Sequence, residues 1–412
     1  MITIKAFKGL RPKESLVERI AAPPYDVLSS QEAKTMAAEN PVSFLHINKP
    51  EIDLPEDVDP YSNVVYEKGR ENLVGFIENG TLIQDEKECI YIYRLTWKDH
   101  VQTGYFCLSS VDDYDNGRIK KHELTRPAKE MDRTRLIDVM NAQVGPVFLL
   151  YPSTSKLDHL LEEGAKRPAN VDFTADDGVR HQLWVIPEAD FINRVVQGFQ
   201  SLDATYIADG HHRSAAASRV CALRRKAQPL YTGKEAFTFF LSVIFPHNQL
   251  KVLPYNRVIK DLNGLTAQAF LQKLNDAFTV EPRAAAREKV QEHTFDLYLD
   301  NQWYTLKAKP GTFNADDPLD QLDVNILMQN ILTPILNIKD PRTDHRIDFI
   351  GGIRGTDELQ KLVDNQEWRC AFSLHPTSVE ALLKIADAGK IMPPKSTWFE
   401  PKLRSGMVSQ LL

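Results

Sequence analysis

Cysteine is scarce in this chain. Four cysteines occur among 412 residues, and none belongs to a C-x-x-C pair. Each lies in an apolar stretch; they are Cys89, Cys107, Cys221 and Cys370. This pattern argues against a structural zinc site and against a disulfide framework, because both need cysteines at short and regular spacings. A reduced, cytoplasmic compartment is the expected location.

The chain also lacks an excess of basic charge and a long apolar run. Lys and Arg number 50 and Asp and Glu number 56, so the formal net charge is −6. Proteins that neutralise many phosphates usually present a basic face, so we do not expect a nucleic-acid partner. No window reaches the roughly 18 apolar residues of a membrane helix, and the first residues show no apolar stretch of signal-peptide length. We therefore expect no association with a membrane.

What remains is the composition of a globular protein. Hydrophobic residues make up 42% and charged residues 26%, which excludes disorder of the bulk of the chain and a fibrous fold. No internal repeat is present, and helical and strand-like segments follow one another in mixed order. This order predicts an α+β (mixed α/β) fold. We divide the chain into an N-terminal α/β segment (1–86) that packs on a core, the core itself (87–247) and a C-terminal α+β domain (248–412).

The apolar spacing predicts the main elements. Helices are expected at residues 32–40, 61–79, 125–140, 192–199, 214–226, 266–278, 323–332 and 378–388. Strands are expected at 89–97, 103–111, 147–150, 181–186, 204–208, 237–245 and 370–374, with a hairpin at 295–307. Gly80 and Gly389 follow two of the helices as C-terminal caps. Three prolines and several acidic residues predict a solvated loop at 50–60.

One segment carries most of the chemistry. An apolar strand ends in Asp209-Gly210-His211-His212-Arg213, and an alanine-rich helix follows at once. Glycine allows a sharp turn and close approach of a ligand, while the helix N-terminus and the cationic side chains favour an anion, most simply a phosphate. Asp209 fits such a site if Mg²⁺ lies between it and the phosphate. The alternatives are a plain helix start capped by Asp209 and a zinc site, although no third His or Cys lies nearby.

Two further segments carry candidate residues. Glu123 lies in the charged stretch 120–127 and is a candidate general base; the alternative is a charged surface turn before a helix. Lys395, Ser396 and Thr397 offer one ammonium and two hydroxyls to a phosphate or a carboxylate. The segment lacks the glycines of a P-loop, and an ordinary surface loop is the alternative.

These segments together resemble a known family. Residues 209–213 match the DGHHR signature of the ParB/sulfiredoxin-like, nucleotide-dependent free serine kinases, and 122–123 match the HE pair that precedes it. Residues 378–397 are similar to the C-terminal helix and Lys-Thr-Thr-type loop of those kinases. The whole chain is also similar to the bacterial domain-of-unknown-function family 1015, in which the segments 23–26, 122–123, 208–213, 347–352 and 393–397 recur in this order.

The resemblance implies a ParB/sulfiredoxin-like nucleotide-binding core, with the N- and C-terminal parts added to it. It implies a kinase that moves a phosphoryl group from ATP or ADP, with Mg²⁺, to the hydroxyl of free L-serine or a similar metabolite. In that mechanism Glu123 is the general base, and Asp209 and His211 complete the catalytic set. Asp209 is also the metal ligand. The residues expected to bind the cofactor are Gly210, His211, His212, Arg213, Lys395, Ser396 and Thr397.

Other functions are left open by the sequence. A non-catalytic, nucleotide-binding regulatory protein would use the same phosphate site, and so would a nucleotide hydrolase. Sulfinic-acid reduction is disfavoured, because His211 stands where the sulfiredoxin branch has its reactive cysteine. A partition protein is disfavoured by the negative net charge. A small-molecule substrate is the expected partner, and a homodimer is left open.

Overall fold

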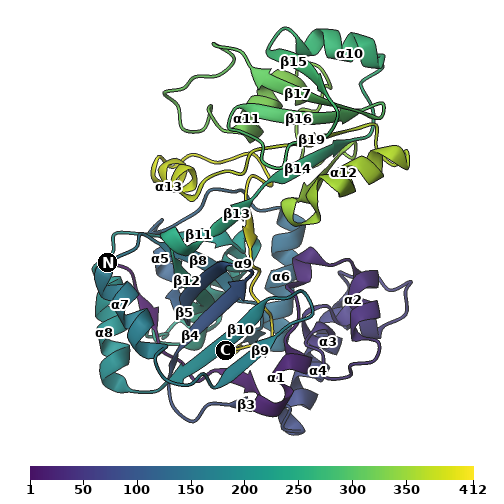
Figure 1. The fold of residues 1–412 in the computed structure, drawn as a ribbon. Coiled ribbons are helices and arrows are strands. Elements are labelled where there is room, and N and C mark those ends of the chain that lie inside the picture. Colours follow the sequence, from purple (N-terminus) through teal and green to yellow (C-terminus); the bar gives the residue numbers. More distant parts are fainter. The chain divides into compact units, whose positions relative to one another are not determined.

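The computed structural model describes residues 1–412, and the chain forms two compact units (Figure 1). Unit 1 consists of Met1–Lys121, Thr125–Leu250 and Pro401–Leu412, and unit 2 consists of His122–Leu124 and Lys251–Glu400. Each unit has its own β-sheet and helices, so the predicted α+β (mixed α/β) class is confirmed. The three-part division of the sequence analysis stays a prediction.

A nine-stranded mixed sheet forms the centre of unit 1. Its strand order is β6-β11-β8-β12-β5-β4-β10-β9, and β1 pairs with β5 beside this path. The pairs β6/β11 and β8/β12 are parallel, and all the other pairs are antiparallel. The strands are β1 (Ile4–Lys5), β4 (Ile90–Trp97), β5 (His100–Ser110), β6 (Ile119–Lys120), β8 (Val147–Tyr151), β9 (Val171–Thr174), β10 (Arg180–Ile186), β11 (Thr205–Asp209) and β12 (Phe239–Pro246).

The central strands are buried along their whole length. Every residue of β8 and of β12 is buried, as expected for strands that are covered on both faces. The helix α7 (Ser155–Gly164) lies on this sheet, and the Tyr105 hydroxyl on β5 donates to its Leu157 carbonyl over 2.5 Å. Aromatic and aliphatic side chains of α7 and α8 (Ala189–Gln200) join the strands in one apolar core. This core holds the end of β11 in place.

A second apolar core joins the N-terminal helices to α6. Tyr66 and Leu73 of one helix pack there with Leu136 and Met140 of another. The helices of unit 1, besides α7 and α8, are α1 (Val17–Ile20), α2 (Ser30–Ala37), α3 (Leu45–Asn48), α4 (Asn63–Glu78), α5 (Val111–Asp115), α6 (Pro127–Met140) and α9 (His211–Ala227). Two small antiparallel pairs complete the unit: β2 (Leu10–Pro12) with β3 (Leu82–Gln84), and β7 (Ala142–Gln143) with β21 (Gln410–Leu411).

Unit 2 is built on a six-stranded sheet in the order β15-β17-β16-β19-β14-β18, in which all pairs are antiparallel. Its strands are β14 (Tyr255–Ile259), β15 (Phe278–Arg283), β16 (Thr294–Leu299), β17 (Gln302–Ala308), β18 (Ile347–Gly351) and β19 (Cys370–Ser373). A separate pair joins β13 (Lys251–Leu253) to β20 (Trp398–Glu400). The helices are α10 (Ala267–Leu274), α11 (Asp323–Leu327), α12 (Gly355–Asp364) and α13 (Val379–Asp387).

Local sequence signals placed most of these elements correctly. The predicted hairpin is confirmed, since Leu299 pairs with Gln302. Asp300 and Asn301 have φ values of 50° and 58° in its two-residue turn, as a type I′ turn requires. The capping glycines are confirmed as well, with φ of 73° at Gly80 and 66° at Gly389.

Three expectations are corrected by the structure. The helix predicted at 266–278 ends at Leu274, and Phe278 instead begins β15 by pairing with Ala308. The helix predicted at 323–332 changes after Leu327 into a π-helical turn. The segment 50–60, predicted as a solvated loop, begins with a 3₁₀ turn, Pro50–Asp53, in which Pro50 and Ile52 are buried. Tertiary packing overrides the local pattern in these places.

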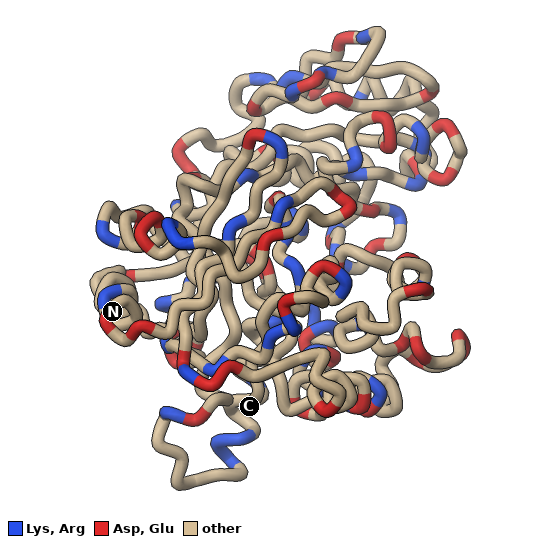
Figure 2. Tube along the Cα trace, turned by 60° about the horizontal axis from the view of Figure 1, so that its bottom comes forward, with Lys and Arg blue, Asp and Glu red and all other residues tan.

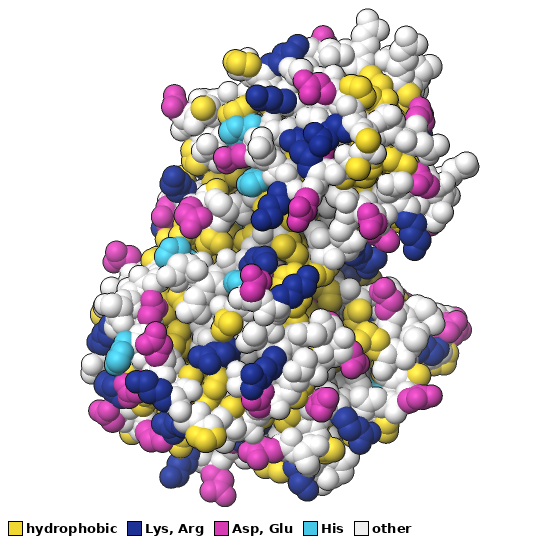
Figure 3. Space-filling model, viewed as in Figure 1, with side chains coloured by type: hydrophobic (Ala, Val, Ile, Leu, Met, Phe, Trp, Pro, Cys, Tyr) yellow, Lys and Arg dark blue, Asp and Glu magenta, His cyan; other side chains and the backbone are white.

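The surface carries charges of both signs. Figure 2 shows Lys and Arg close to Asp and Glu at many places along the chain, and the face in Figure 3 has both signs interspersed. This distribution is typical of a solvated surface and differs from a continuous basic field. Among the helices, none combines the length and the apolar character that crossing a bilayer takes.

Candidate functional site

The turn from β11 to α9 is the centre of the candidate site in unit 1. Asp209 is the last residue of β11, and α9 begins at His211, three residues earlier than the sequence predicts. Gly210 connects them with φ 100° and ψ 29°. A Cβ at this position would lie 3.2 Å from the guanidinium of Arg213 and 3.4 Å from the Val147 Cα. Glycine is therefore required here by backbone conformation and by space.

The early start of α9 changes the position of Arg213. Its side chain points into the interior, and only 8% of the residue is exposed. One guanidinium nitrogen donates to the Pro146 carbonyl, and another lies 3.7 Å from a carboxylate oxygen of Asp26 and 3.7 Å from one of Asp209. Burial by itself lowers the pKa of Arg213. The carboxylates of Asp26 and Asp209 raise the pKa by more than burial lowers it, so the pKa lies above its usual value and the guanidinium stays charged.

A lysine that the sequence analysis did not select pairs with Asp209. The Lys402 ammonium lies 2.9 Å from the second carboxylate oxygen of Asp209, and both side chains are largely buried. Lys402 belongs to the C-terminal segment of unit 1 and is 193 positions away in the sequence. No local pattern indicates such a contact. Asp209 therefore stands between two cations, Lys402 and Arg213.

His212 is held by the start of a neighbouring helix. Its Nε2 accepts a hydrogen bond of 2.9 Å from the backbone N–H of Arg126, which precedes α6. This acceptor role requires an unprotonated Nε2, so the neutral ring carries its proton on Nδ1. His211 is 6% exposed and begins the same first turn. Both histidines of the motif are thus fixed by the packing of α9 and do not extend freely into solvent.

The segment 23–26, which the resemblance marks as site-like, lies beside this turn. Asp26 reaches Arg213 as described, and the Tyr25 ring is covered by the Arg133 guanidinium at 4.1 Å from its centre. Arg133 in turn forms an ion pair of 2.8 Å with Asp132. Tyr25, Arg133 and Arg213 line one cavity of unit 1. The structure therefore brings segment 23–26 together with the DGHHR motif.

Glu123 belongs to unit 2. The short segment His122–Leu124 is anchored there by a backbone hydrogen bond of 2.8 Å from the Met392 N–H to the His122 carbonyl. Glu123 lines a pocket of about 320 Å³, together with Lys339, Arg342 and residues 391–394. Both cationic side chains are exposed, and Arg342 forms an ion pair of 2.8 Å with Asp340, which lines the same pocket.

A buried arginine of unit 2 contacts the backbone of the loop 395–397, the predicted phosphate-binding loop. Arg257 is 3% exposed and donates to the Lys395 carbonyl over 2.9 Å. Burial lowers the pKa of Arg257 to about 10, but the group remains charged at neutral pH. The Ser396 hydroxyl donates to the Pro393 carbonyl over 2.6 Å, so it closes the loop on itself. Lys395 adopts a left-handed conformation, with φ 57°.

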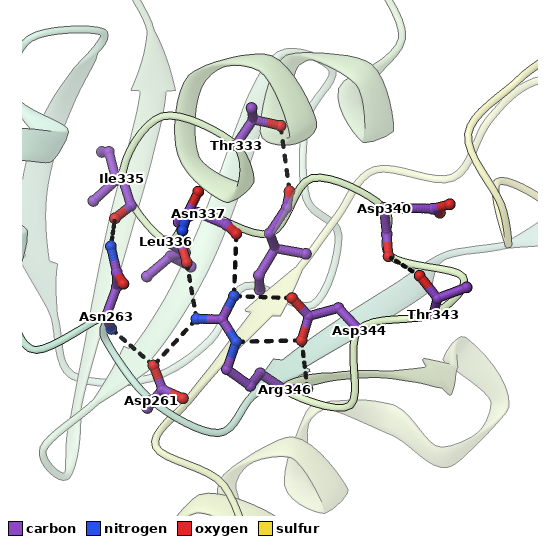
Figure 4. A network of polar contacts seen from close by, with 11 residues as sticks. Asp261, Asn263, Thr333, Ile335, Leu336, Asn337, Asp340, Thr343, Asp344 and Arg346 are labelled. Carbon is purple, nitrogen blue, oxygen red and sulfur yellow. Dashed lines mark hydrogen bonds and ion pairs between the residues drawn. The ribbon is translucent and has the colours of Figure 1, made fainter.

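The segment 347–352 packs against Trp398 within unit 2. It forms β18, and a Cβ at Gly351 would lie 2.8 Å from the Trp398 ring, so the strand and β20 are in close contact. The preceding Arg346 joins two loops: it pairs with Asp344 at 2.9 Å and donates to the Leu336 and Asn337 carbonyls over 3.0 and 3.1 Å (Figure 4). These bonds give Arg346 a structural role.

Comparisons with known proteins agree with the family resemblance. A family model described as "Protein of unknown function (DUF1015)" matches residues 4–325. A search of curated proteins found no match. Among solved structures, a conserved hypothetical protein from Pyrococcus furiosus has 14% identity and a TM-score of 0.39, covering 74% of this chain and 95% of that one.

Two further similar structures are mutant forms of a free serine kinase. The one in complex with AMP has 13% identity and a TM-score of 0.38, and covers 71% of this chain and 87% of that one. The one in complex with ADP has 13% identity and a TM-score of 0.37, with the same coverage of both chains.

Proposed function

The chain belongs to the DUF1015 family, and from that premise we propose that it is a nucleotide-dependent phosphotransferase that acts on the hydroxyl of free L-serine or a similar small metabolite. The observation that carries the proposal is the turn between β11 and α9. There a glycine with φ 100° leads directly into a helix of 17 residues, beside the Asp209–Lys402 pair. Phosphoryl transfer asks a protein mainly for positioning and for neutralisation of charge, and this turn offers both.

The phosphates of ATP or ADP would bind at the first turn of α9. The first N–H groups of a helix have no carbonyl of the preceding turn to bind, and the helix dipole is positive at this end. Gly210 allows the backbone to approach the phosphate, and His211 and His212 stand in the same turn. Lys402 would exchange its contact with Asp209 for one with a phosphate oxygen, which is favourable because the phosphate carries more negative charge.

Mg²⁺ fits this turn only in part. Asp209 offers a carboxylate, which is the right ligand type for Mg²⁺. However, one of its oxygens is bonded to Lys402, and the other lies 3.7 Å from Arg213. A metal ion would have to displace the ammonium, so no step of the proposal depends on the ion.

Glu123 stays the proposed general base, on the strength of the HE motif. A base accepts the hydroxyl proton of the acceptor as its oxygen attacks the terminal phosphorus. Lys395 and Thr397 stay proposed contacts of substrate or nucleotide. Ser396 has its hydroxyl bonded within the loop, so its proposed role is to hold the loop's shape.

Phosphorus NMR tests the proposal. The full chain is incubated with ATP or ADP, Mg²⁺ and L-serine, and O-phosphoserine is the expected product. Glu123→Gln should abolish product formation while nucleotide binding, measured by calorimetry, stays unchanged. Glu281→Gln is the matched control, because Glu281 is an exposed carboxylate of unit 2 on β15, outside the proposed site; it should leave turnover unchanged.

The other outcomes assign the alternative functions. Formation of inorganic phosphate alone would make the protein a hydrolase. Nucleotide binding without turnover in the parent would make it a regulatory binding protein. Absence of nucleotide binding, with no thermal shift by ATP or ADP, would refute the phosphate site itself, since a ligand of the folded state raises its apparent stability.

A further inference from the structure

One face of the unit 2 sheet is apolar under α12 and polar beside it. Val258 on β14, Ala371 on β19 and Tyr298 on β16 are neighbours across the strands. Leu359 and Val363 of α12 pack with them in one apolar cluster. Side chains on one face of a strand recur every second residue, so the positions two residues away on each strand continue this face.

The continuing positions are Asn256 on β14, Ser373 on β19 and Asp296 on β16, and all three residues are at most 3% exposed. Asp296 is neutralised by Arg287, which donates to it through its backbone N–H over 2.7 Å and its Nε over 2.9 Å. The Asn256 oxygen accepts from the Leu374 N–H over 3.1 Å. The Asn256 amide nitrogen and the Ser373 hydroxyl, by contrast, donate to no group of the chain.

A cavity of about 490 Å³ in unit 2 is lined by Asn256 and Ser373. This volume is in the range of sites for small organic molecules. Buried polar groups are almost always hydrogen-bonded, so two buried donors on the wall of a cavity of this size indicate a ligand-binding wall. The apolar residues of the same wall are Val252, Leu253, Pro254, Val290, Leu374 and Pro376.

The start of α12 supplies further donors to the cavity. Gly355 and Thr356, the first two residues of this 10-residue helix, both line it. The preceding Arg354 provides no side-chain cap, so the first N–H groups of α12 need acceptors from elsewhere. The dipole of a helix is positive at this end and favours negative charge. Asp357 and Glu358 belong to the same first turn, but neither lines the cavity.

The charged groups of the wall agree with an anionic ligand. Arg287 uses its Nε for Asp296 and one terminal nitrogen for Thr305, which leaves its other terminal nitrogen for a ligand. Lys289 adds an exposed ammonium, and Glu288 is the single carboxylate of the wall and is exposed as well. Because donors predominate on the buried part of the wall, the cavity favours a group rich in acceptor oxygens, such as a phosphate.

We propose that this cavity of unit 2 binds a phosphate monoester with a compact apolar body. Asn256, Ser373 and the first N–H groups of α12 would donate to the phosphoryl oxygens, and the apolar residues of the wall would contact the body. The cavity shares no residue with the β11–α9 turn or with the pocket of Glu123, so the inference goes beyond the proposed phosphotransferase function and does not depend on it.

Calorimetric titration of the full chain tests the proposal with three probes: phenyl phosphate, inorganic phosphate and phenol. Phenyl phosphate has both parts of the proposed ligand, whereas inorganic phosphate has only the anion and phenol only the apolar body. Phenyl phosphate should therefore bind at least tenfold more tightly than either of the other two probes.

Two substitutions test whether phenyl phosphate binds in this cavity. Asn256→Asp keeps the oxygen that accepts from the Leu374 N–H and replaces the donating nitrogen by a negatively charged oxygen, so binding should weaken at least tenfold. Ser373→Ala removes one donor and should weaken binding about threefold or more, with an unchanged thermal midpoint in the absence of ligand. The matched control Asn301→Asp adds the same charge at an exposed turn outside the cavity and should leave binding unchanged.

Equal binding of phenyl phosphate by the parent, Asn256→Asp and Ser373→Ala would place the probe elsewhere in the protein and overturn the assignment. Absence of binding overturns it too, and so does equally tight binding of phenol or of inorganic phosphate. If Asn256→Asp lowers the thermal midpoint, Ser373→Ala decides the test alone. Formation of O-phosphoserine is measured separately, so failure of the phosphotransferase proposal would leave this assignment standing.

Discussion

Replacing Gly210 by alanine is the sharpest test of the turn between β11 and α9. The residue has φ 100°, a conformation that glycine adopts freely and alanine adopts only at a cost of about 1–2 kcal/mol. The new Cβ would also lie 3.2 Å from the Cζ and Nε of Arg213 and 3.4 Å from the Val147 Cα. The guanidinium is held by the Pro146 carbonyl and cannot move away easily, which adds roughly 1 kcal/mol of overpacking.

The expected loss for Gly210→Ala is therefore about 2–3 kcal/mol in the free energy of unfolding of unit 1. Two other glycines of this unit separate the contributions. Gly80 has φ 73° with nothing within 4 Å of its Cβ position, so Gly80→Ala should lose only the conformational part, about 1 kcal/mol. Gly75 lies inside α4 with open space around it, and Gly75→Ala should stabilise by about 0.5–1 kcal/mol.

Urea unfolding followed by circular dichroism measures the three variants against the parent. From the most to the least stable, the expected order is Gly75→Ala, parent, Gly80→Ala and Gly210→Ala. A thermal-shift titration with ADP adds the functional readout: Gly210→Ala should lose the ADP-induced shift, while both other variants should keep it. The reasoning is refuted if Gly210→Ala is as stable as Gly80→Ala and still responds to ADP, because the turn would then tolerate a side chain.

Three further predictions concern buried charge. Asp323 accepts one hydrogen bond from the His293 N–H, its other oxygen has no partner, and burial raises its pKa to about 7. The stability that its protonated form provides is therefore lost as pH rises from about 4 to 7. Asp323→Asn should be more stable than the parent at pH 8 by up to about 4 kcal/mol and equally stable at pH 4, as measured by urea unfolding. His181 is buried, and its pKa is lowered to about 3, mainly by burial and also by the charge of Arg404. As pH falls below 6.5 the unfolded chain binds a proton at this residue and the folded chain does not, so the protein loses stability. His181→Gln should reduce the loss of stability between pH 7 and pH 4 by up to about 3 kcal/mol, and an equal loss in both proteins would contradict this. Lys402→Met should weaken ADP binding about tenfold or more, since a charge-assisted hydrogen bond contributes roughly 1.5–3 kcal/mol. The control Lys402→Arg keeps the positive charge and should keep most of the affinity. Unchanged affinity for ADP in Lys402→Met would exclude the ammonium from the phosphate site.

Much of the fold could be predicted from local patterns. The two-residue turn at Asp300 and the capping glycines at 80 and 389 follow from conformations that few residue types adopt. The buried strands β8 and β12 follow from apolar runs of strand length. The exceptions lie where tertiary packing changes the local outcome: Phe278 pairs with Ala308 in a strand although the spacing before it continues a helical pattern.

Only part of the candidate site could be predicted from local sequence patterns. The strand–glycine–helix order around Gly210 predicted the turn, but α9 starts three residues earlier than its alanine-rich part suggests. That shift turns Arg213 into the interior, where it lies near Asp26. The ion pair of Asp209 with Lys402 spans 193 positions and has no counterpart in local sequence.

The amino-acid sequence by itself determined which segments form most of the strands, turns and helices, because these depend on side-chain period, on glycine at positive φ and on caps within a few residues. It also determined the residue types of the turn at 209–213. Only the tertiary structure decided which of these groups are buried, which charges neutralise one another and which, like the amide of Asn48, have no partner. The reason is physical: burial and pairing depend on segments that meet in space, and their energies depend on the exclusion of water, which no single segment can achieve alone.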